Sequence, residues 1–400
     1  MNYLSDRINL LAESETLAMT RRSRELSAQG FDIINLSIGE PDFDTPDHVK
    51  EAAKEAIDQN YSHYTPVPGY IELRKAIANK LKRDNGLNYT AEQIVVSTGA
   101  KQSLANAILS LVNPGDEVLI PAPYWVSYKE IIKLAGGKGV FIEGNIQSDF
   151  KVTPEQIEDA ITPETKVFMF SSPCNPSGTV YSYDELKAFA DVFALHPQVF
   201  IISDEIYENI NFAGKHHSIA SFENIHDRVI LINGLSKGFA MTGWRLGYMA
   251  ANIEIAKACD KLQGQITSGT CSITQRAAIV AMNTDPADSA EIKMMVEAFK
   301  YRRNLAISLL RETPGIKTNV PDGAFYLFPD VTSYYGKSIG DRVILSGSDL
   351  CDYILETAFV AIVPGAAFGS PDCIRISYAT SEENLREAIK RINAALSKLK

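Results

Sequence analysis

Cysteine is scarce in this chain and follows no recognisable spacing. Only five of the 400 residues are cysteines. They are Cys174, Cys259, Cys271, Cys351 and Cys373. An odd number of widely separated cysteines without a C-x-x-C pair indicates neither a disulfide framework nor a zinc site. We therefore expect a reduced, cytoplasmic protein that binds no metal.

The chain also lacks an excess of basic residues and any long apolar run. Its formal net charge is -10, which leaves no basic surface to displace counterions from nucleic-acid phosphates. No apolar segment approaches the length that crosses a bilayer, and Asp6, Arg7 and Glu13 interrupt the region where a secretory signal would lie. We therefore expect neither a nucleic-acid nor a membrane partner.

Short apolar strands alternate with amphipathic helices through the middle of the chain. The predicted strands cover residues 93–97, 117–120, 167–170, 199–203 and 229–232, and the predicted helices cover residues 103–111, 126–134 and 184–193. This alternation predicts βαβ units and a mostly parallel sheet with helices on both faces. Ligands of such sheets bind at the carboxyl ends of the strands.

The last hundred residues follow a different pattern. The elements predicted there are a long polar helix at residues 288–310, short strands at 323–328 and 374–377, and a final helix from 382 to about 398, capped by Thr380 or Ser381. We expect a large domain over residues 47–287, which contains the parallel sheet, and a smaller α/β domain over residues 288–400. The N-terminal segment, residues 1–46, is expected to pack against the smaller domain.

One lysine lies in a turn of small residues directly after the predicted strand at residues 229–232. The segment GLSKGFAMTGWRLG places Ser236 one residue before Lys237 and Arg245 eight residues after it. A lysine amine forms a Schiff base with an aldehyde, while a hydroxyl and a guanidinium beside it bind phosphate. These are the groups that pyridoxal phosphate (PLP) requires. For the S-K-G tripeptide alone, a surface lysine near a loop is the alternative.

Polar side chains follow other predicted strands as well. The carboxylate of Asp204 suits pairing with the pyridine nitrogen of PLP, and the hydroxyl of Tyr207 suits its phenolic oxygen. The alternative role of Asp204 is to cap a helix. Asn175 lies between prolines in the loop SSPCNPSG, so its amide is held where it could face the same phenolic oxygen, although the loop also reads as a simple turn.

Four further positions suit anions or an aromatic ring. Residues 97–101 (STGAK) form a predicted strand-to-helix turn whose free N–H groups suit a phosphate. Trp125 follows a strand and suits stacking on a pyridine ring, with a core aromatic as the alternative. Arg375, on a short apolar strand, suits a bidentate clamp for a substrate carboxylate or else an internal salt bridge. Tyr64 either offers its hydroxyl to phosphate or packs within its loop.

Taken together, these residues make the chain resemble the class I, fold-type I PLP-dependent aminotransferases along essentially its whole length, in particular their bacterial aspartate aminotransferase branch. The motifs that carry the resemblance are GEPDFDTP, YTPVPGYIELRKAIA, PAPYWVSY, SSPCNPSGTVYS, SDEIYE, SKGFAMTGWRLGY and IRISYATSEENL. The resemblance implies an α/β fold, with a mostly parallel seven-stranded sheet flanked by helices in the large domain and a smaller α/β domain built from both termini. It also implies a homodimer with shared active sites that acts on amino acids and 2-oxo acids.

The resemblance assigns a role to each predicted residue. Lys237 carries the cofactor and then acts as general base. The other residues implied for the cofactor are Asp204 at the pyridine nitrogen, Asn175 and Tyr207 at the phenolic oxygen, Trp125 on the ring, and, at the phosphate, Ser236, Arg245, the backbone of Gly99, Ala100 and Lys101, and Tyr64 of the partner subunit. Those implied for the substrate α-carboxylate are Arg375, Asn175, Trp125 and the backbone of Gly39.

Substrate choice is implied by the same resemblance. In the branch that this chain resembles, Lys101 and an N-terminal segment that includes Thr16 meet the distal carboxylate, which favours aspartate, glutamate or prephenate. Ala12 and Glu13 stand where some prephenate-using relatives carry a basic residue. We therefore predict ping-pong transamination between L-aspartate and 2-oxoglutarate, giving oxaloacetate and L-glutamate. A glutamate/aspartate-prephenate aminotransferase and a class I aminotransferase of broader specificity are the alternatives.

Two rival classes use the same fold. A β-lyase or synthase would keep the lysine, the aspartate and the arginine, because a fold does not fix its chemistry. The ligand-sensing domain of a transcription regulator would need a DNA-binding extension before the GEPDFDTP motif, and the acidic charge argues against it.

Overall fold

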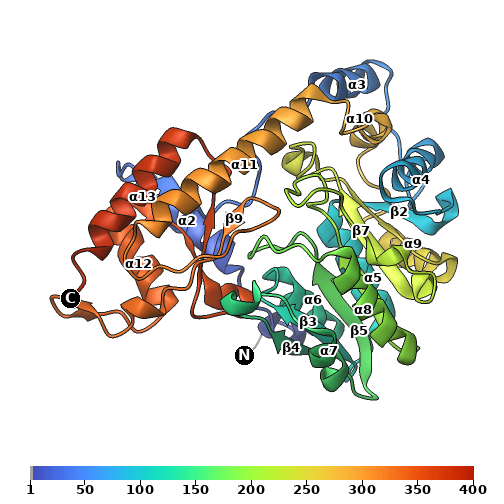
Figure 1. The fold of residues 1–400 in the computed structure, drawn as a ribbon. Helices are drawn as coiled ribbons and strands as arrows, with labels where there is room; N and C mark the ends of the chain where they lie inside the picture. The colour runs from blue at the N-terminus through green and yellow to red at the C-terminus, as the bar shows by residue number, and fades with distance from the viewer. Residues whose placement is uncertain (1–2) are drawn as a thin grey trace.

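Seven strands form the central sheet of the larger part of the molecule (Figure 1). The protein is represented by a computed structural model that describes residues 3–400. The strands are β2 (Ile94–Ser97), β3 (Glu117–Ala122), β4 (Lys138–Glu143), β5 (Thr165–Ser171), β6 (Phe200–Asp204), β7 (Val229–Gly234) and β8 (Gly247–Ala250). Their order is β2-β8-β7-β6-β5-β3-β4, and β8 runs antiparallel to both of its neighbours whereas the other pairs are parallel. The prediction of a mostly parallel seven-stranded sheet is confirmed.

Neighbouring side chains of these strands alternate between two hydrophobic cores. Val96 and Leu231 pack into one core, while Val95 and Ile230 pack into the other. The helices of the first core are α3 (Asp47–Asp58), α4 (Ile71–Asn85), α7 (Pro154–Ala160), α8 (Tyr183–Leu195) and α10 (Ser272–Asn283). Those of the second core are α5 (Ala100–Leu111), α6 (Ser127–Ala135) and α9 (Ile253–Ile266). The sheet is therefore covered on both faces, as parallel strands require.

Two elements begin three residues away from the prediction, a larger difference than at the other predicted boundaries. Helix α5 begins at Ala100 and not at residue 103, because Gly99 adopts a φ of +84°, which lets the chain turn from strand directly into helix. The strand predicted at residues 323–328 shortens to β9 (Tyr326–Leu327), because in the sheet only these two residues pair with β14 (Ile374–Ser377).

The smaller part of the molecule has its own core. Its main elements are β9, β13 (Val363–Pro364) and β14 in one antiparallel sheet, the hairpin β10 (Ser338–Ile339) and β11 (Arg342–Val343), and helices α11 (Ala290–Arg311), α12 (Gly347–Ala358) and α13 (Glu382–Leu396). In Figure 1, α11 runs as one long helix from beside α3 and α10 into the smaller part. The side chain of Ser381 accepts the N–H of Asn384, so Ser381 caps the final helix.

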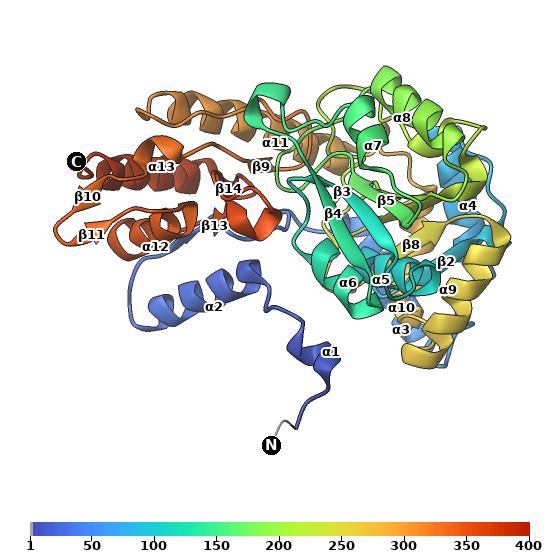
Figure 2. The ribbon, with the colours of Figure 1, turned by 90° about the horizontal axis from the view of Figure 1, so that it is seen from below.

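The N-terminal segment contacts this smaller part. Strand β1 (Ile34–Asn35) pairs in parallel with β12 (Val360–Ala361), and Met19 of α2 (Glu15–Ala28) packs into the same core. Figure 2 shows α2 below α12, with the short helix α1 (Asp6–Asn9) beyond it. The predicted domain boundaries, after residues 46 and 287, stay predictions. Among residues 3–400, no helix has the combination of length and apolar character needed to cross a membrane.

Candidate active site

A cavity of about 460 Å³ lies at the carboxyl ends of the sheet strands, where the large part meets α2, the N-terminal segment and β14. The sequence-predicted residues that line it are Thr16, Gly39, Ala100, Lys101, Trp125, Asn175, Asp204, Tyr207, Ser236, Lys237, Arg245 and Arg375. Gly99 does not line the cavity but directly precedes Ala100, which does. Tyr64 does not line the cavity and is 98% exposed. Parallel strands that end at one edge thus bring together most of the residues predicted from separate motifs.

Lys237 lies three residues after the end of β7, and its side chain lines the cavity. Its Nζ donates a hydrogen bond to the carbonyl oxygen of Gly39. Burial lowers the pKa of Lys237 to about 8. The negative charge of Glu40 opposes this shift, and the positive charge of Arg375 adds to it. A useful fraction of this amine is therefore neutral, and nucleophilic, near neutral pH.

Asp204 ends the central strand β6 and is buried. Burial raises the pKa of Asp204 to about 6. Two donors favour its ionised form: the hydroxyl of Tyr128 at 2.8 Å and the backbone N–H of Ile206 at 3.3 Å. The residues after Asp204 form turns, and the next helical element in the described chain is the short turn at Ile219–Ser221, so the helix-cap alternative is wrong.

The turn between β2 and α5 has the features of an anion site. The first N–H groups of α5, those of Ala100 and Lys101, have no acceptor within the helix. The N–H of Gly99 donates to Ser97 O at 2.8 Å and so is used within the turn. A Cβ atom at Gly99 would lie 2.5 Å from Nη2 of Arg245, so only glycine lets this guanidinium approach the turn. Backbone N–H groups and a guanidinium therefore meet at the helix N-terminus, an arrangement that suits a phosphate.

Arg375 is a buried cation without a carboxylate partner. Its side chain, 2% exposed, donates from Nη1 to Asn175 Oδ1 at 3.0 Å and from Nη2 to Ser37 O at 2.6 Å. No ion pair to an acidic residue of the described chain lies within 4 Å, and its Nε has no hydrogen-bond partner. The internal salt-bridge alternative is therefore not found. A buried guanidinium is costly unless an anion neutralises it, which suits a ligand carboxylate.

The aromatic residues of the wall form a connected group. Tyr207 and Tyr326 share a hydrogen bond of 2.8 Å between their hydroxyls, and the Tyr326 ring lies 4.5 Å from the Arg375 guanidinium. Trp125 is half-buried, with Nζ of Lys101 4.9 Å from its ring centroid. Burial lowers the pKa of Lys101, with Arg245 acting in the same direction. Tyr128 and Tyr326 escaped the sequence analysis, because no local pattern links them to Asp204 or Tyr207.

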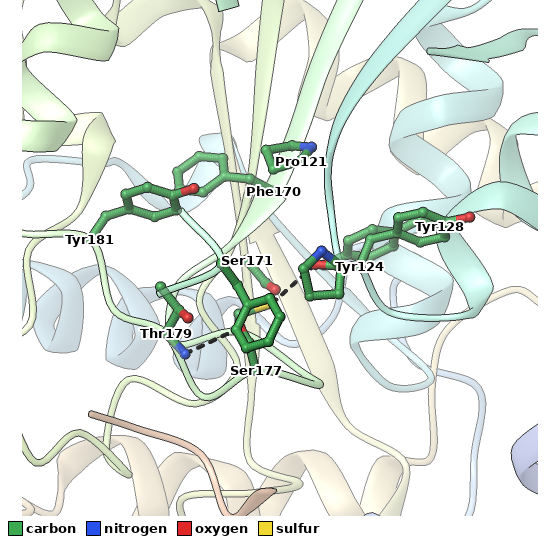
Figure 3. Close-up of a pocket in the computed structure, with 11 residues that line it drawn as sticks. Pro121, Tyr124, Tyr128, Phe170, Ser171, Ser177, Thr179 and Tyr181 are labelled. Carbon is green, nitrogen blue, oxygen red and sulfur yellow. Dashed lines mark hydrogen bonds between the residues drawn. The ribbon is translucent and has the colours of Figure 1, made fainter. Parts of the chain in front are cut away.

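A small second cavity lies between the ends of β3 and β5 (Figure 3). Tyr128, the hydrogen-bond partner of Asp204, is part of its wall. Its volume of about 10 Å³ has room for at most one water molecule. Cys174, in its wall, is buried and contacts the carbonyl oxygen of Pro123 at 3.6 Å. Burial raises the pKa of this thiol, so it stays protonated and serves packing.

A group of charged side chains begins at Glu205, directly after Asp204 in the chain. Glu205, Glu208 and His216 bring their ligand atoms within 4.8 Å of one another. The ammonium of Lys80 contacts Glu208, and Nε2 of His216 lies 2.9 Å from Glu205. Positive side chains thus supply the charge that a metal ion would otherwise bring, and the group serves as an internal network of ion pairs.

Comparisons with known proteins agree with this architecture. Residues 32–392 match the family described as "Aminotransferase class I and II". A probable aspartate/prephenate aminotransferase of Rhizobium leguminosarum bv. phaseoli is 47% identical over 396 residues, 98% of each chain. The aspartate aminotransferase of Bacillus subtilis (strain 168) is 44% identical over 397 residues, 99% of each chain.

Two solved structures show the same fold. An aspartate aminotransferase from Rhizobium meliloti aligns over 100% of both chains with a TM-score of 0.96 and 42% identity. An aspartate aminotransferase from Thermus thermophilus with maleate aligns over 99% of this chain and 100% of that one, with a TM-score of 0.93 and 39% identity. The chain therefore belongs to the class I and II aminotransferases, enzymes that act on amino acids and 2-oxo acids.

Proposed function

We propose that this aminotransferase binds PLP in the 460 Å³ cavity and transfers the amino group of L-aspartate to 2-oxoglutarate. One observation carries the proposal. Lys237, with its lowered pKa, lies in the same cavity as an anion site at the start of α5 and the unneutralised Arg375. A lysine amine, a phosphate site and a carboxylate site are the three things that a PLP enzyme for amino acids needs.

The donor set fits the cofactor. We assign the phosphate to the N–H groups of Ala100 and Lys101, to Ser236 and to Arg245, with Gly99 leaving the space that this requires. The remaining cofactor contacts that we assign are Asp204 at the ring nitrogen, Asn175 and Tyr207 at the phenolic oxygen, and Trp125 on the ring. Bound there, PLP would supply an aldehyde that condenses with amines and a protonated ring that withdraws electrons from the carbon bearing the amine.

The protein's own residues would bind the substrate and move its protons. Arg375, already oriented by Asn175 and Ser37 O, binds the α-carboxylate of the amino acid. Lys237 Nζ then takes the proton from the substrate Cα, a role that suits an amine with a pKa of about 8. Asp204 holds a positive charge at the ring nitrogen, and such a cation would in turn lower the pKa of Asp204 and keep it ionised.

The dicarboxylate preference rests on the side chains of Lys101 and Thr16, which both line the cavity and have no other role in this assignment. The named relatives support it: one is described as an aspartate aminotransferase, and the solved Thermus thermophilus relative was determined with maleate. Other relatives, described as aspartate/prephenate aminotransferases at 47% identity, favour prephenate as the second candidate acceptor.

A homodimer is part of the proposal. Tyr64 is almost fully exposed and lies outside the cavity of its own chain, so it contributes to a phosphate site only if it reaches that of a partner subunit. A cytoplasmic location stays a prediction from composition.

The experiment for this function is a half-reaction followed by visible spectroscopy. Purified protein that contains PLP is expected to be yellow and to lose that colour when L-aspartate is added without any oxo acid. Adding 2-oxoglutarate afterwards is expected to restore it. A yellow protein that responds to glutamate with prephenate but not to aspartate would favour the second candidate. A protein that stays colourless with added PLP would contradict the proposed cofactor.

Replacing Tyr128 with phenylalanine tests the support of Asp204. The variant loses the hydroxyl that donates to the buried Asp204 carboxylate at 2.8 Å. The pKa of Asp204 then rises, so the acidic limb of the kcat profile is expected to move to higher pH. We expect kcat to fall about tenfold at neutral pH, as for the loss of one hydrogen bond to a charged group.

The matched control is Tyr183→Phe, at an exposed tyrosine outside the cavity. A Tyr128→Phe enzyme with lower kcat but an unshifted pH profile would show that Tyr128 acts by packing alone.

A further inference from the structure

Two tyrosine hydroxyls meet in the wall of the 460 Å³ cavity, one from each part of the molecule. Tyr207 follows the end of β6 at the edge of the large sheet, whereas Tyr326 lies on β9 of the smaller part. Their oxygens are 2.8 Å apart, and both side chains are buried. The proposed function gives Tyr207 a contact with the phenolic oxygen of PLP but leaves Tyr326 without a role.

The hydroxyl of Tyr326 is held between two elements of the proposed site. A Cβ atom at Gly39 would lie 2.6 Å from its oxygen, so the backbone of Gly39 packs directly against it. The ring centroid of Tyr326 lies 4.5 Å from the guanidinium carbon of Arg375, and Tyr326 pairs with Ser377 of the neighbouring strand β14. Tyr326 thus joins the proposed α-carboxylate site to Tyr207.

The pair of hydroxyls leaves one hydrogen atom unused. Each hydroxyl has a single hydrogen to donate, and only one of the two forms the bond between them. Among residues 3–400, neither hydroxyl has another hydrogen-bond partner. Burial raises the pKa of both groups, but the positive charge of Arg375, which faces the Tyr326 ring, opposes the rise there and makes Tyr326 the stronger donor. Tyr326 therefore donates to Tyr207, and the hydrogen of Tyr207 is left to donate into the cavity.

We infer that Tyr326 is a positioning residue that fixes the hydroxyl of Tyr207 as a donor to the phenolic oxygen of PLP. The inference rests on the proposed function, because it presupposes that this oxygen lies at Tyr207. A hydroxyl that accepts one hydrogen bond becomes a better donor in the next, because successive bonds polarise one another. Tyr326 therefore strengthens the bond from Tyr207 and acts on the cofactor through it.

The visible spectrum of the PLP-containing protein reports the strength of this bond. The nitrogen that links Lys237 to PLP changes the colour of the protein when it takes up a proton, and a negative charge on the phenolic oxygen stabilises that proton. A donor to the oxygen withdraws this charge, so a stronger donor lowers the pKa of the linked nitrogen. The pH midpoint of the colour change therefore measures how strongly Tyr207 donates, independently of turnover.

The test titrates the colour of PLP-containing wild type, Tyr326→Phe, Tyr207→Phe and the double variant. The charged groups that act on the pair, Lys237, Asp204 and Arg375, are the same in all four proteins. Tyr207→Phe is expected to raise the midpoint by about 1–2 pH units, as for the loss of one hydrogen bond to a charged group. Tyr326→Phe is expected to raise it by about 0.5 pH unit, because it weakens that bond without removing it. Added to Tyr207→Phe, it is expected to cause no further rise, because the two hydroxyls act in series.

The matched control is Tyr353→Phe, which removes a buried hydroxyl from the core of the same smaller part, where it donates to Ala395 O at 2.8 Å. Its midpoint is expected to equal that of wild type. The inference is overturned if Tyr326→Phe leaves the midpoint unchanged or lowers it, or if it shifts the midpoint equally with and without the Tyr207 hydroxyl. Failure of the proposed function looks different, since wild type would then take up no PLP and show no colour change to titrate.

Discussion

We expect the Lys237→Ala variant to turn over aspartate about 10⁴-fold more slowly than wild type, the upper end of what one acid–base residue contributes. The variant loses both the amine that carries the cofactor and the group that moves the Cα proton. Its remaining cavity keeps the assigned phosphate and α-carboxylate groups, so PLP and substrate are expected to bind still. The measurement is single-turnover kinetics with aspartate on protein reconstituted with PLP.

The pH dependence of PLP uptake gives an independent readout of the same residue. The attacking form is the neutral amine, and the pKa of Lys237 is about 8. Uptake by cofactor-free wild type is therefore expected to accelerate with pH and to level off above about pH 8. Lys54→Ala, at an exposed lysine paired with Glu51, is the control and should behave as wild type. Normal turnover by Lys237→Ala would contradict the assigned role.

Asp204→Asn is expected to lower kcat by about 10²- to 10³-fold, because removing one partner of a buried charge pair costs about 3–5 kcal/mol. The amide has nearly the size of the carboxylate but carries no charge, so it cannot hold the ring nitrogen in its protonated form. Asp204→Glu keeps the charge in a longer side chain and is expected to recover part of the rate. An asparagine variant with more than a tenth of wild-type kcat would contradict the pairing.

The same substitution is expected to stabilise the cofactor-free protein. Burial raises the pKa of Asp204 to about 6 from 3.8, so the folded state binds the proton more tightly than the unfolded state. The free energy of unfolding of wild type therefore falls as pH rises from about 4 to 6. Asp204→Asn removes this dependence, and at pH 7 we expect a gain on the order of 3 kcal/mol in denaturant unfolding. A variant that is less active but also less stable would show that Asp204 mainly supports the fold.

Local sequence signals were sufficient for five of the seven strands of the large sheet and for the residues that follow them, whereas β4 and β8 were not predicted. Asp204, Lys237 and Asn175 could be placed because each lies at the carboxyl end of an apolar strand, and one sheet edge collects all such ends. The turn at Gly99 could be predicted for the same reason, although the helix begins three residues earlier than its apolar pattern indicates.

Contacts between distant segments could not be predicted in this way. Tyr128 meets Asp204 across 76 residues, and Tyr326 meets Tyr207 across 119. Tyr128 lies on the apolar face of the amphipathic helix α6 and Tyr326 on the apolar strand β9, where a buried aromatic residue is the ordinary expectation. The short strand β9 was overestimated because its apolar neighbours Ala324 and Phe325 are buried by packing and not by strand pairing.

The most direct test of the account is to reduce the PLP-containing protein with borohydride and to map the modified peptide by mass spectrometry. Borohydride makes a carbon–nitrogen link between the cofactor and a lysine permanent. The account predicts one pyridoxyl group per chain, on Lys237, and none after the enzyme has been treated with excess L-aspartate before reduction. Modification of Lys101 or another lysine in place of Lys237, or labelling that aspartate does not prevent, would contradict it.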